Sequence, residues 1–291
     1  MRSLIPILTV VAAIFVIWYA AAVALNTPWA KDQAKRNNVE LSFTALVADT
    51  WSQKKPKLPA PHQVVAEIWK TTGEMVAKGR AFSKRSLIYH SWITLSATML
   101  GFVMGTSFGI LLAIGIVYNR VMDMSVMPWV IASQTIPILA IAPMIIVVLN
   151  AVGISGLLPK AMISMYLSFF PVVVGMVKGL RSPDGMQLDQ MRTWNATSGQ
   201  EFWRLRLPSS MPFLFASLKV AMAASLVGAI VGELPTGAVA GLGARLLAGS
   251  YYGQTIQIWS ALIMAAALAA LLVALIGMIQ KITLRKMGMA Q

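Results

Sequence analysis

The chain has 291 residues, of which 57% are hydrophobic and only 12% charged, and its mean hydropathy is +0.71. A soluble domain of this size would carry about twice that charged fraction, so the composition indicates an integral membrane protein. The formal charge of +14 favours anionic lipid head groups and a cytoplasmic partner over nucleic acid, and the lack of cysteine excludes disulfides and thiolate metal sites.

The first predicted membrane span is Leu4–Leu25, an apolar stretch that follows Arg2 and ends at a polar, proline-containing sequence. About 20 residues at a rise of 1.5 Å cross the hydrocarbon core. A cleaved signal peptide is the alternative, but an apolar run beyond about 15 residues is longer than a usual signal core. We therefore expect a retained helix over residues 1–26.

Residues 27–88 form the longest polar region and are predicted to be a periplasmic loop. The loop contains the proline-rich connector Lys54–Pro61. After it, Val64–Ala77 has apolar residues at helical spacing, which predicts a helix at the membrane interface. The many lysines here conflict with the positive-inside rule. Since loops of about 60 residues translocate largely regardless of charge, the short loops decide the orientation.

The second predicted span, Ser91–Val117, carries Gly101, Gly105 and Gly109 at four-residue spacing. This spacing predicts a helix face against which another helix packs closely. Glycines scattered through the span by membrane composition are the alternative. A short cytoplasmic turn, Tyr118–Ser125, is expected to follow.

The third predicted span, Pro128–Val152, contains Gln134, Thr135 and Asn150 as well as internal prolines. Polar side chains at membrane depth usually face protein or a wet cavity, and prolines often mark helices that line a path. Gln134, Thr135 and Asn150 are therefore candidates for a translocation path. A purely structural kink explains the prolines equally well.

The last three spans are predicted at Ala161–Val177, Pro212–Leu234 and Thr255–Gln280. Glu233, at the end of the fifth, is a further candidate for the path or for contact with a partner, and a water-exposed helix end is the alternative. Lysine and arginine are concentrated in the short segments on one side of the predicted membrane. By the positive-inside rule, these six helices have both termini in the cytoplasm.

A polar and basic segment, Asp189–Pro208, lies between the fourth and fifth spans and must therefore lie in water. Its arginines mark that side as cytoplasmic. Apolar residues such as Met191 and Trp194 alternate with the charges, which predicts a short amphipathic helix followed by a turn. Such a surface suits docking on a partner protein, and an ordinary solvated loop is the alternative.

This segment resembles the cytoplasmic signature loop of binding-protein-dependent ABC-transporter permeases. That pattern is E-A-A, three residues and G, followed about nine residues later by an apolar residue, any residue and L-P. Asp189 takes the acidic place, Asn195 the glycine and Leu207-Pro208 the closing pair. Gln190-Met191 replaces the two alanines. Asparagine tolerates left-handed backbone better than most residues, so the turn is expected to survive.

The likeness is closest to permeases of the nitrate/sulfonate/taurine type and covers the chain from about Leu58 to Lys286. It implies an all-α type I importer fold in the bacterial inner membrane, with a permease core over residues 89–286 that includes a coupling loop over residues 179–211. It also implies docking of a helix, Asp189–Gly199, in a cleft of the ATPase. The implied coupling residues are Asp189, Met191, Arg192, Trp194, Asn195, Gly199, Leu207 and Pro208.

The resemblance further implies two ABC ATPase subunits, a second permease that is either identical or a paralogue, and a periplasmic solute-binding protein. The solute would be small and organic, similar to a sulfonate, taurine or nitrate, or to a pyrimidine or thiamine precursor. The chain lacks the nucleotide-binding pattern G-x-x-x-x-G-K-[ST], so we expect no enzyme activity and no cofactor in it, with ATP and Mg²⁺ held by the partner.

The sequence leaves two alternative functions. An ion-coupled secondary transporter is the main alternative, but it would usually have more spans, inverted repeats and buried ion-binding residues. A membrane-embedded enzyme or assembly factor is disfavoured because the sequence contains no cluster of residues suited to catalysis.

Overall fold

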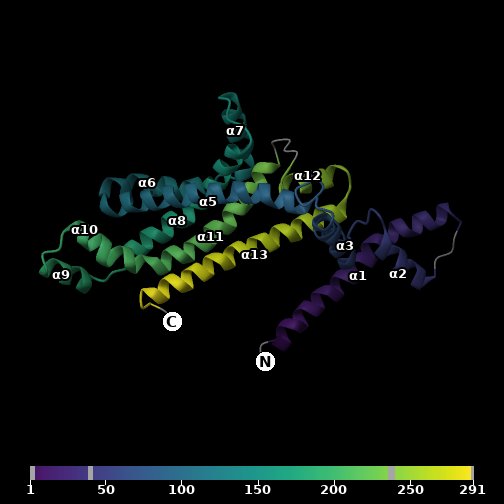
Figure 1. Ribbon diagram of the computed structural model, residues 1–291, viewed down its shortest axis with the longest axis horizontal. Coiled ribbons are helices and arrows are strands. Elements are labelled where there is room, and N and C mark those ends of the chain that lie inside the picture. Colours follow the sequence, from purple (N-terminus) through teal and green to yellow (C-terminus); the bar gives the residue numbers. More distant parts are fainter. Residues whose placement is uncertain (1–3, 39–41, 235–239, 290–291) are drawn as a thin grey trace. The chain divides into compact units, whose positions relative to one another are not determined.

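The computed structural model describes residues 4–38, 42–234 and 240–289, and in these ranges it contains helices and no β-strand (Figure 1). The chain divides into two compact units, Met1–Ser91 with Ala244–Ala265, and Trp92–Gly243 with Ala266–Gln291. The helices are α1 (Leu4–Arg36), α2 (Phe43–Ser52), α3 (Pro61–Thr71), α4 (Gly73–Ala77), α5 (Leu87–Tyr118), α6 (Arg120–Ser133), α7 (Ile138–Ala151), α8 (Leu157–Leu180), α9 (Gly185–Thr193), α10 (Ser198–Glu201), a π-helical turn (Phe202–Arg206), α11 (Leu207–Glu233), α12 (Leu242–Tyr251) and α13 (Thr255–Lys286).

Within the described residues, five continuous helical segments are long and apolar enough to cross a membrane. They are α1, α5, α8, α13 and the segment Ser198–Glu233, which contains α11. The pair α6 and α7 would supply a sixth crossing if it is counted as one broken span. The predicted all-helical membrane protein with about six spans is therefore confirmed.

The third predicted span is wrong as a single helix. The chain instead bends by 101° between α6 and α7, and residues 134–137 separate the two helices. Pro137 has no amide hydrogen to donate and disfavours helical backbone in the residue before it, which favours a break of the helix here. Figure 1 shows α7 projecting steeply from the end of α6. Pro128 and Pro143 are accommodated inside their helices.

The predicted turn Tyr118–Ser125 is also wrong, because α6 begins almost as soon as α5 ends. The only residue between them is Asn119, and its side-chain oxygen accepts hydrogen bonds from the amides of Val121 (2.9 Å) and Met122 (3.4 Å). An asparagine that caps the first free amides lets a helix start at once. Residues 120–125 are therefore the first turns of a helix.

In the first unit, α1 continues 11 residues past the predicted end at Leu25, to Arg36. The polar sequence after Leu25, which predicted the end of this helix, takes part in a tertiary contact instead. Asn26 is fully buried, and its side chain bonds the backbone of the proline-rich connector at Lys57 (2.8 Å) and at Leu58 (2.8 Å). The predicted interfacial helix is divided into α3 and α4 at Thr72.

In the second unit, the glycine face of α5 packs against α8, as predicted. A Cβ atom added at Gly101 would lie 2.4 Å from the Cβ of Ser164, and one at Gly105 would lie 2.1 Å from the Oγ of Ser168. One at Gly109 would lie 2.9 Å from the carbonyl oxygen of Phe169. Since any side chain would force these helices apart, the four-residue glycine spacing is a packing surface.

Helices α8 and α11 lie side by side and form the centre of the second unit (Figure 1). Small residues allow this approach: a Cβ atom at Gly228 would lie 2.7 Å from the Cα of Ser164. The Ser164 hydroxyl donates to the carbonyl of Ser225, and the Ser225 hydroxyl donates to the carbonyl of Thr98 on α5, both at 2.8 Å. The two buried hydroxyls thus tie three helices together in the interior of the unit.

Candidate functional site: the loop between α8 and α11

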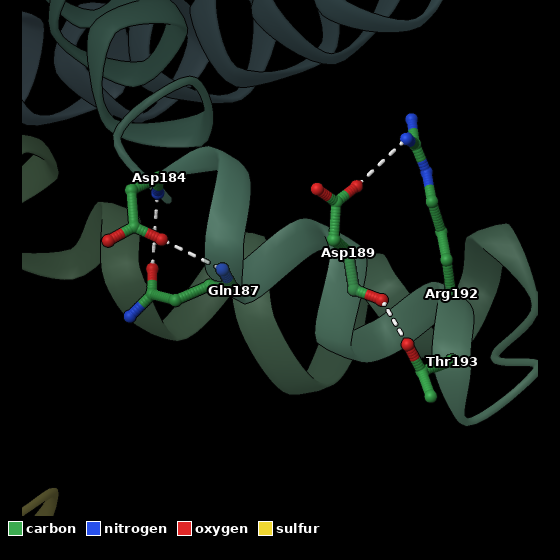
Figure 2. A network of polar contacts seen from close by, with 5 residues as sticks. All are labelled: Asp184, Gln187, Asp189, Arg192 and Thr193. Carbon is green, nitrogen blue, oxygen red and sulfur yellow. Dashed lines mark hydrogen bonds and ion pairs between the residues drawn. The ribbon is translucent and has the colours of Figure 1, made fainter.

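The first helix of the predicted coupling loop is α9, which is capped at its start. The Asp184 carboxylate accepts from the amide of Gln187 at 2.8 Å, and the Gln187 side chain accepts from the amide of Asp184 at 3.2 Å. This reciprocal capping box satisfies two amides that the helix start would leave free. Further along, Asp189 pairs with Arg192 at 3.1 Å and its carbonyl accepts from the Thr193 hydroxyl at 2.9 Å (Figure 2).

The end of α9 is a Schellman motif centred on Asn195. The amide of Asn195 donates to the carbonyl of Arg192 at 2.8 Å, and the amide of Ala196 donates to that of Met191 at 3.0 Å. The motif needs left-handed backbone, and Asn195 has φ +51°. The expectation that asparagine preserves the turn is confirmed. The predicted helix Asp189–Gly199 is wrong, because this turn ends α9 at Thr193 and the helix begins four residues earlier, at Gly185.

The second half of the loop runs without interruption into α11. Thr197 caps α10, and a π-helical turn follows, in which the amide of Leu207 donates to the carbonyl of Phe202. Pro208 explains the wider turn, because it cannot donate to the carbonyl four residues before it and its ring would crowd that carbonyl. At Gly199 an added Cβ would meet only the Thr197 hydroxyl, at 4.0 Å, so packing does not require glycine there.

A cleft of about 400 Å³ lies between the two halves of the loop. Its lining combines amide and guanidinium groups with apolar side chains, namely Gln187, Gln190, Met191, Trp194, Ala196, Gln200, Arg204 and Leu205. Trp194 is 67% exposed although it is the largest apolar side chain of this set. An exposed tryptophan beside polar groups is typical of a protein-binding surface.

The path candidates are not brought together at one point. Gln134 and Thr135 are exposed at the break between α6 and α7, where the Thr135 hydroxyl donates to the carbonyl of Ala132 at 2.7 Å. Asn150, near the end of α7, lines a separate cleft of about 530 Å³ together with Lys160. Their contact with a solute stays a prediction.

Glu233 is completely buried, so the interpretation as a water-exposed helix end is wrong. The Thr94 hydroxyl of α5 donates to its Oε1 at 2.9 Å, and the amide of Gly243 donates to its Oε2 at 2.7 Å. Gly241, just before α12, lies against the carboxylate: its φ is +128°, and an added Cβ there would lie 2.2 Å from Cδ of Glu233. A role of Glu233 in the path stays a prediction.

Similarity to known proteins shows the family of this chain. Residues 105–289 match the family described as the inner membrane component of binding-protein-dependent transport systems. The chain belongs to this family. It is therefore an ABC-transporter permease, as the resemblance of the coupling loop implied, and it is a multi-pass protein of the inner membrane.

The permease is 31% identical over 170 residues to the formylaminopyrimidine transport permease protein ThiX of Halalkalibacterium halodurans. The matched residues are 58% of this chain and 66% of that one, so the chain spans just under two thirds of the length of this relative. It is 28% identical to the riboflavin transport system permease protein RibX of Chloroflexus aurantiacus, covering 78% and 80%. It is 23% identical to the putative aliphatic sulfonates transport permease protein SsuC of Bacillus subtilis, covering 71% and 69%.

Sequence reasoning missed the residues that join the coupling loop of the permease to its spans. Arg206 donates through Nε to Glu201 at 2.5 Å and through a terminal nitrogen to the carbonyl of Leu180, at the end of α8, at 2.9 Å. Its Cζ lies 5.9 Å from the ring centre of Tyr118, at the end of α5. The opposite charges of Glu201 and Arg206 are visible in the sequence, whereas the contacts with Leu180 and Tyr118 are not.

We expect substitutions at Asn195 of the permease to follow backbone conformation. Asn195→Gly should be tolerated, because glycine adopts positive φ freely. Asn195→Val should fray the end of α9, since left-handed backbone costs an ordinary residue about 1–2 kcal/mol and a β-branched one is a clear outlier there. Limited trypsin digestion after Arg192 measures the fraying. Thr193→Val is the matched control, because it places the same side chain at a helical position, and equal digestion of both valine variants would contradict the prediction.

Proposed function

We propose that the permease is the membrane subunit of an ATP-driven importer and forms the path for a small organic solute delivered by a periplasmic binding protein. The observation that carries the proposal is the coupling loop itself. It is a capped helix followed by a cleft, with Trp194 exposed beside that cleft. Membership of an inner-membrane family of binding-protein-dependent systems supports the same function.

The coupling loop would bind one of two ATPase subunits, each docked on one of two permeases, identical or paralogous. Met191 and Trp194 face the cleft and would supply apolar contacts. Asp189 and Arg192 are both more than two thirds exposed and bonded to each other, so they would supply polar contacts at the rim. Apolar anchors surrounded by a polar rim are the usual composition of such interfaces. ATP and Mg²⁺ would be bound by the partner.

Movement of the loop would reach several spans through the contacts at its two ends. At its end, Arg206 holds the carbonyl of Leu180 and faces Tyr118. At its beginning, Arg181 pairs with Asp123 in the first turn of α6 at 2.8 Å. Force on the loop would therefore act on α5, α6, α8 and α11 together, which suits a change between inward- and outward-facing states.

The path is proposed to include Gln134 and Thr135, because they lie exposed at the break between α6 and α7. Backbone that leaves helical geometry at membrane depth is tolerated where it lines a cavity or is covered by protein. Asn150 and Glu233 remain proposed members of the path. The solute is proposed to be a sulfonate, taurine or nitrate, or a pyrimidine or thiamine precursor, since the relatives' names include a formylaminopyrimidine and aliphatic sulfonates.

Reconstitution tests the function directly. The permease is purified with the subunits that accompany it, placed in vesicles and supplied either with ATP and Mg²⁺ or with an ion gradient alone. An importer should co-purify with an ATP-hydrolysing subunit and accumulate solute only with ATP and a binding protein. Accumulation driven by the ion gradient alone would instead establish the ion-coupled transporter.

Orientation is predicted from the short loops, and the lack of native cysteine allows a clean labelling test. Cysteines introduced at Ser198, in the coupling loop, and at Ser250, in α12, would each be exposed. In intact cells, a membrane-impermeant maleimide should label the cysteine at 250 and not the one at 198. Reversed labelling would place the coupling loop outside the cell and remove the proposed contact with the ATPase.

A further inference from the structure

A cleft of about 650 Å³ lies between the beginning of α11 and the end of α13, and the coupling proposal does not use it. Its wall consists of Pro212 from α11 together with Gly277, Gln280, Lys281, Leu284, Arg285 and Met289 from α13 and the residues just after it. Below the cleft the two helices pack through Phe215, Met222, Leu272 and Ile276. The cleft is therefore the place where two packed helices diverge at their ends.

The cleft is strongly cationic. Lys281 and Arg285 are exposed, and they lie one turn apart on the same face of α13. Lys219 of α11 lies beside Gly277, where an added Cβ would be 3.8 Å from the lysine Nζ. The sequence of α13 contains no acidic residue. Among the described residues, no ion pair involves any of these three cations.

A polar atom of the cleft is also left without a partner. The Oε1 of Gln280 is buried and accepts no hydrogen bond from the described residues. Such an atom is costly unless a donor from another molecule reaches it. The cleft thus offers positive charge for an anion and a buried acceptor for a hydroxyl group.

The surface next to the cleft is apolar along α13. The exposed apolar side chains on this helix are Leu262, Leu271, Leu275, Met278, Ile279 and Ile282. They precede or adjoin Lys281, after which the helix becomes basic. This sequence of apolar surface followed by cations is the arrangement of a helix leaving the hydrocarbon core. The cleft therefore lies at the level of lipid head groups.

We propose that this cleft binds the head group of an anionic phospholipid of the phosphatidylglycerol type. Lys281 and Arg285 would bind its phosphate, with Lys219 adding positive charge, and a glycerol hydroxyl would donate to Oε1 of Gln280. The acyl chains would extend over the exposed apolar side chains of α13. Basic pockets between membrane helices suit anionic head groups. A free phosphate would use the cations and leave the apolar surface uncovered, so the lipid is the better match.

The test compares neighbouring charges. The full-length permease, purified in detergent with its accompanying subunits, is titrated with short-chain phosphatidylglycerol, phosphatidylcholine and inorganic phosphate, and bound molecules are counted by native mass spectrometry. Phosphatidylglycerol should bind far better than the other two. Arg285→Gln and Lys281→Gln should each weaken it about fivefold, the usual contribution of one cation at such a surface. Lys286→Gln removes the same charge outside the cleft and should change binding by less than twofold.

Three outcomes would overturn the proposal. Equal weakening by Arg285→Gln and Lys286→Gln would mean that the helix end attracts anions without a site. Inorganic phosphate binding as tightly as phosphatidylglycerol would assign the cleft to a soluble anion. Loss of an accompanying subunit from Arg285→Gln would show that the cleft is a protein interface. None of these results bears on the importer proposal, whose own test is ATP-dependent uptake.

Discussion

Replacing Trp194 with alanine is expected to release the ATPase subunit or to uncouple ATP hydrolysis from uptake, while the spans stay folded. The side chain is 67% exposed and lines the cleft of the coupling loop, so it contributes little to the fold of the isolated chain. Large aromatic anchors that become buried at an interface often account for about 2 kcal/mol or more, which corresponds to roughly 30-fold weaker binding. The measurements are retained ATPase, hydrolysis rate and uptake in the same preparation.

Trp203 provides the matched control for this experiment. It is 68% exposed, lies in the π-helical turn of the same loop, and does not line the cleft. Trp203→Ala should therefore retain the ATPase much better than Trp194→Ala. If Trp194→Ala kept full coupling, or if both variants lost it equally, the docking surface would have to lie elsewhere, and residues 118–125 would be the next candidate.

Replacing Gly101 with leucine is expected to prevent correct packing of α5 against α8. An added Cβ would already lie 2.4 Å from Ser164 and 2.6 Å from the carbonyl oxygen of Ala161, so backbone has to move. Overpacking in a well-packed interior costs about 1–3 kcal/mol, and more where backbone is displaced. We expect a large fall in the yield of monodisperse protein and in its melting temperature in detergent.

Gly115, on the same helix, is the control for that substitution. An added Cβ there would lie 2.8 Å from the Sδ and Cε of Met122, the flexible end of a side chain that rotates away at low cost. Gly115→Leu should therefore fold with a melting temperature close to that of the parent. Equal loss in both variants would mean that leucine is harmful in α5 for reasons unrelated to the contact with α8.

Except for the third, hydropathy predicted the spans well, because each depends on its own composition. The fourth, fifth and sixth predicted spans lie within a few residues of α8, α11 and α13. The predicted ends of the helices were less accurate. The helix α1 continues past Leu25, because Asn26 is buried under another segment of the chain, to which its side chain bonds. The polar residue that predicted the end of the helix instead makes a tertiary contact inside it. A single stretch of sequence does not distinguish a polar residue at a helix end from one that makes a buried contact.

In the coupling loop, too, some features could be predicted from the sequence and others could not. The left-handed backbone of Asn195 followed from its place in the signature pattern and from the tolerance of asparagine for that conformation. The start of α9 at Gly185 was missed, although Asp184 and Gln187 form a capping box that is readable in sequence. The contact of Arg206 with Leu180 and Tyr118 was not readable, because it joins three helix ends.

The sequence by itself determined that this is a helical membrane protein, its family, and the loop that a partner would bind, because hydropathy, charge and a local motif carry that information. Only the tertiary structure decided which proline breaks the third span and what surrounds Glu233. Pro128, Pro137 and Pro143 obey the same local rules, and their neighbours decide which one ends a helix. Glu233 is bound by Thr94, 139 positions earlier in the chain, a pairing that exists only once α5 and α11 have packed together.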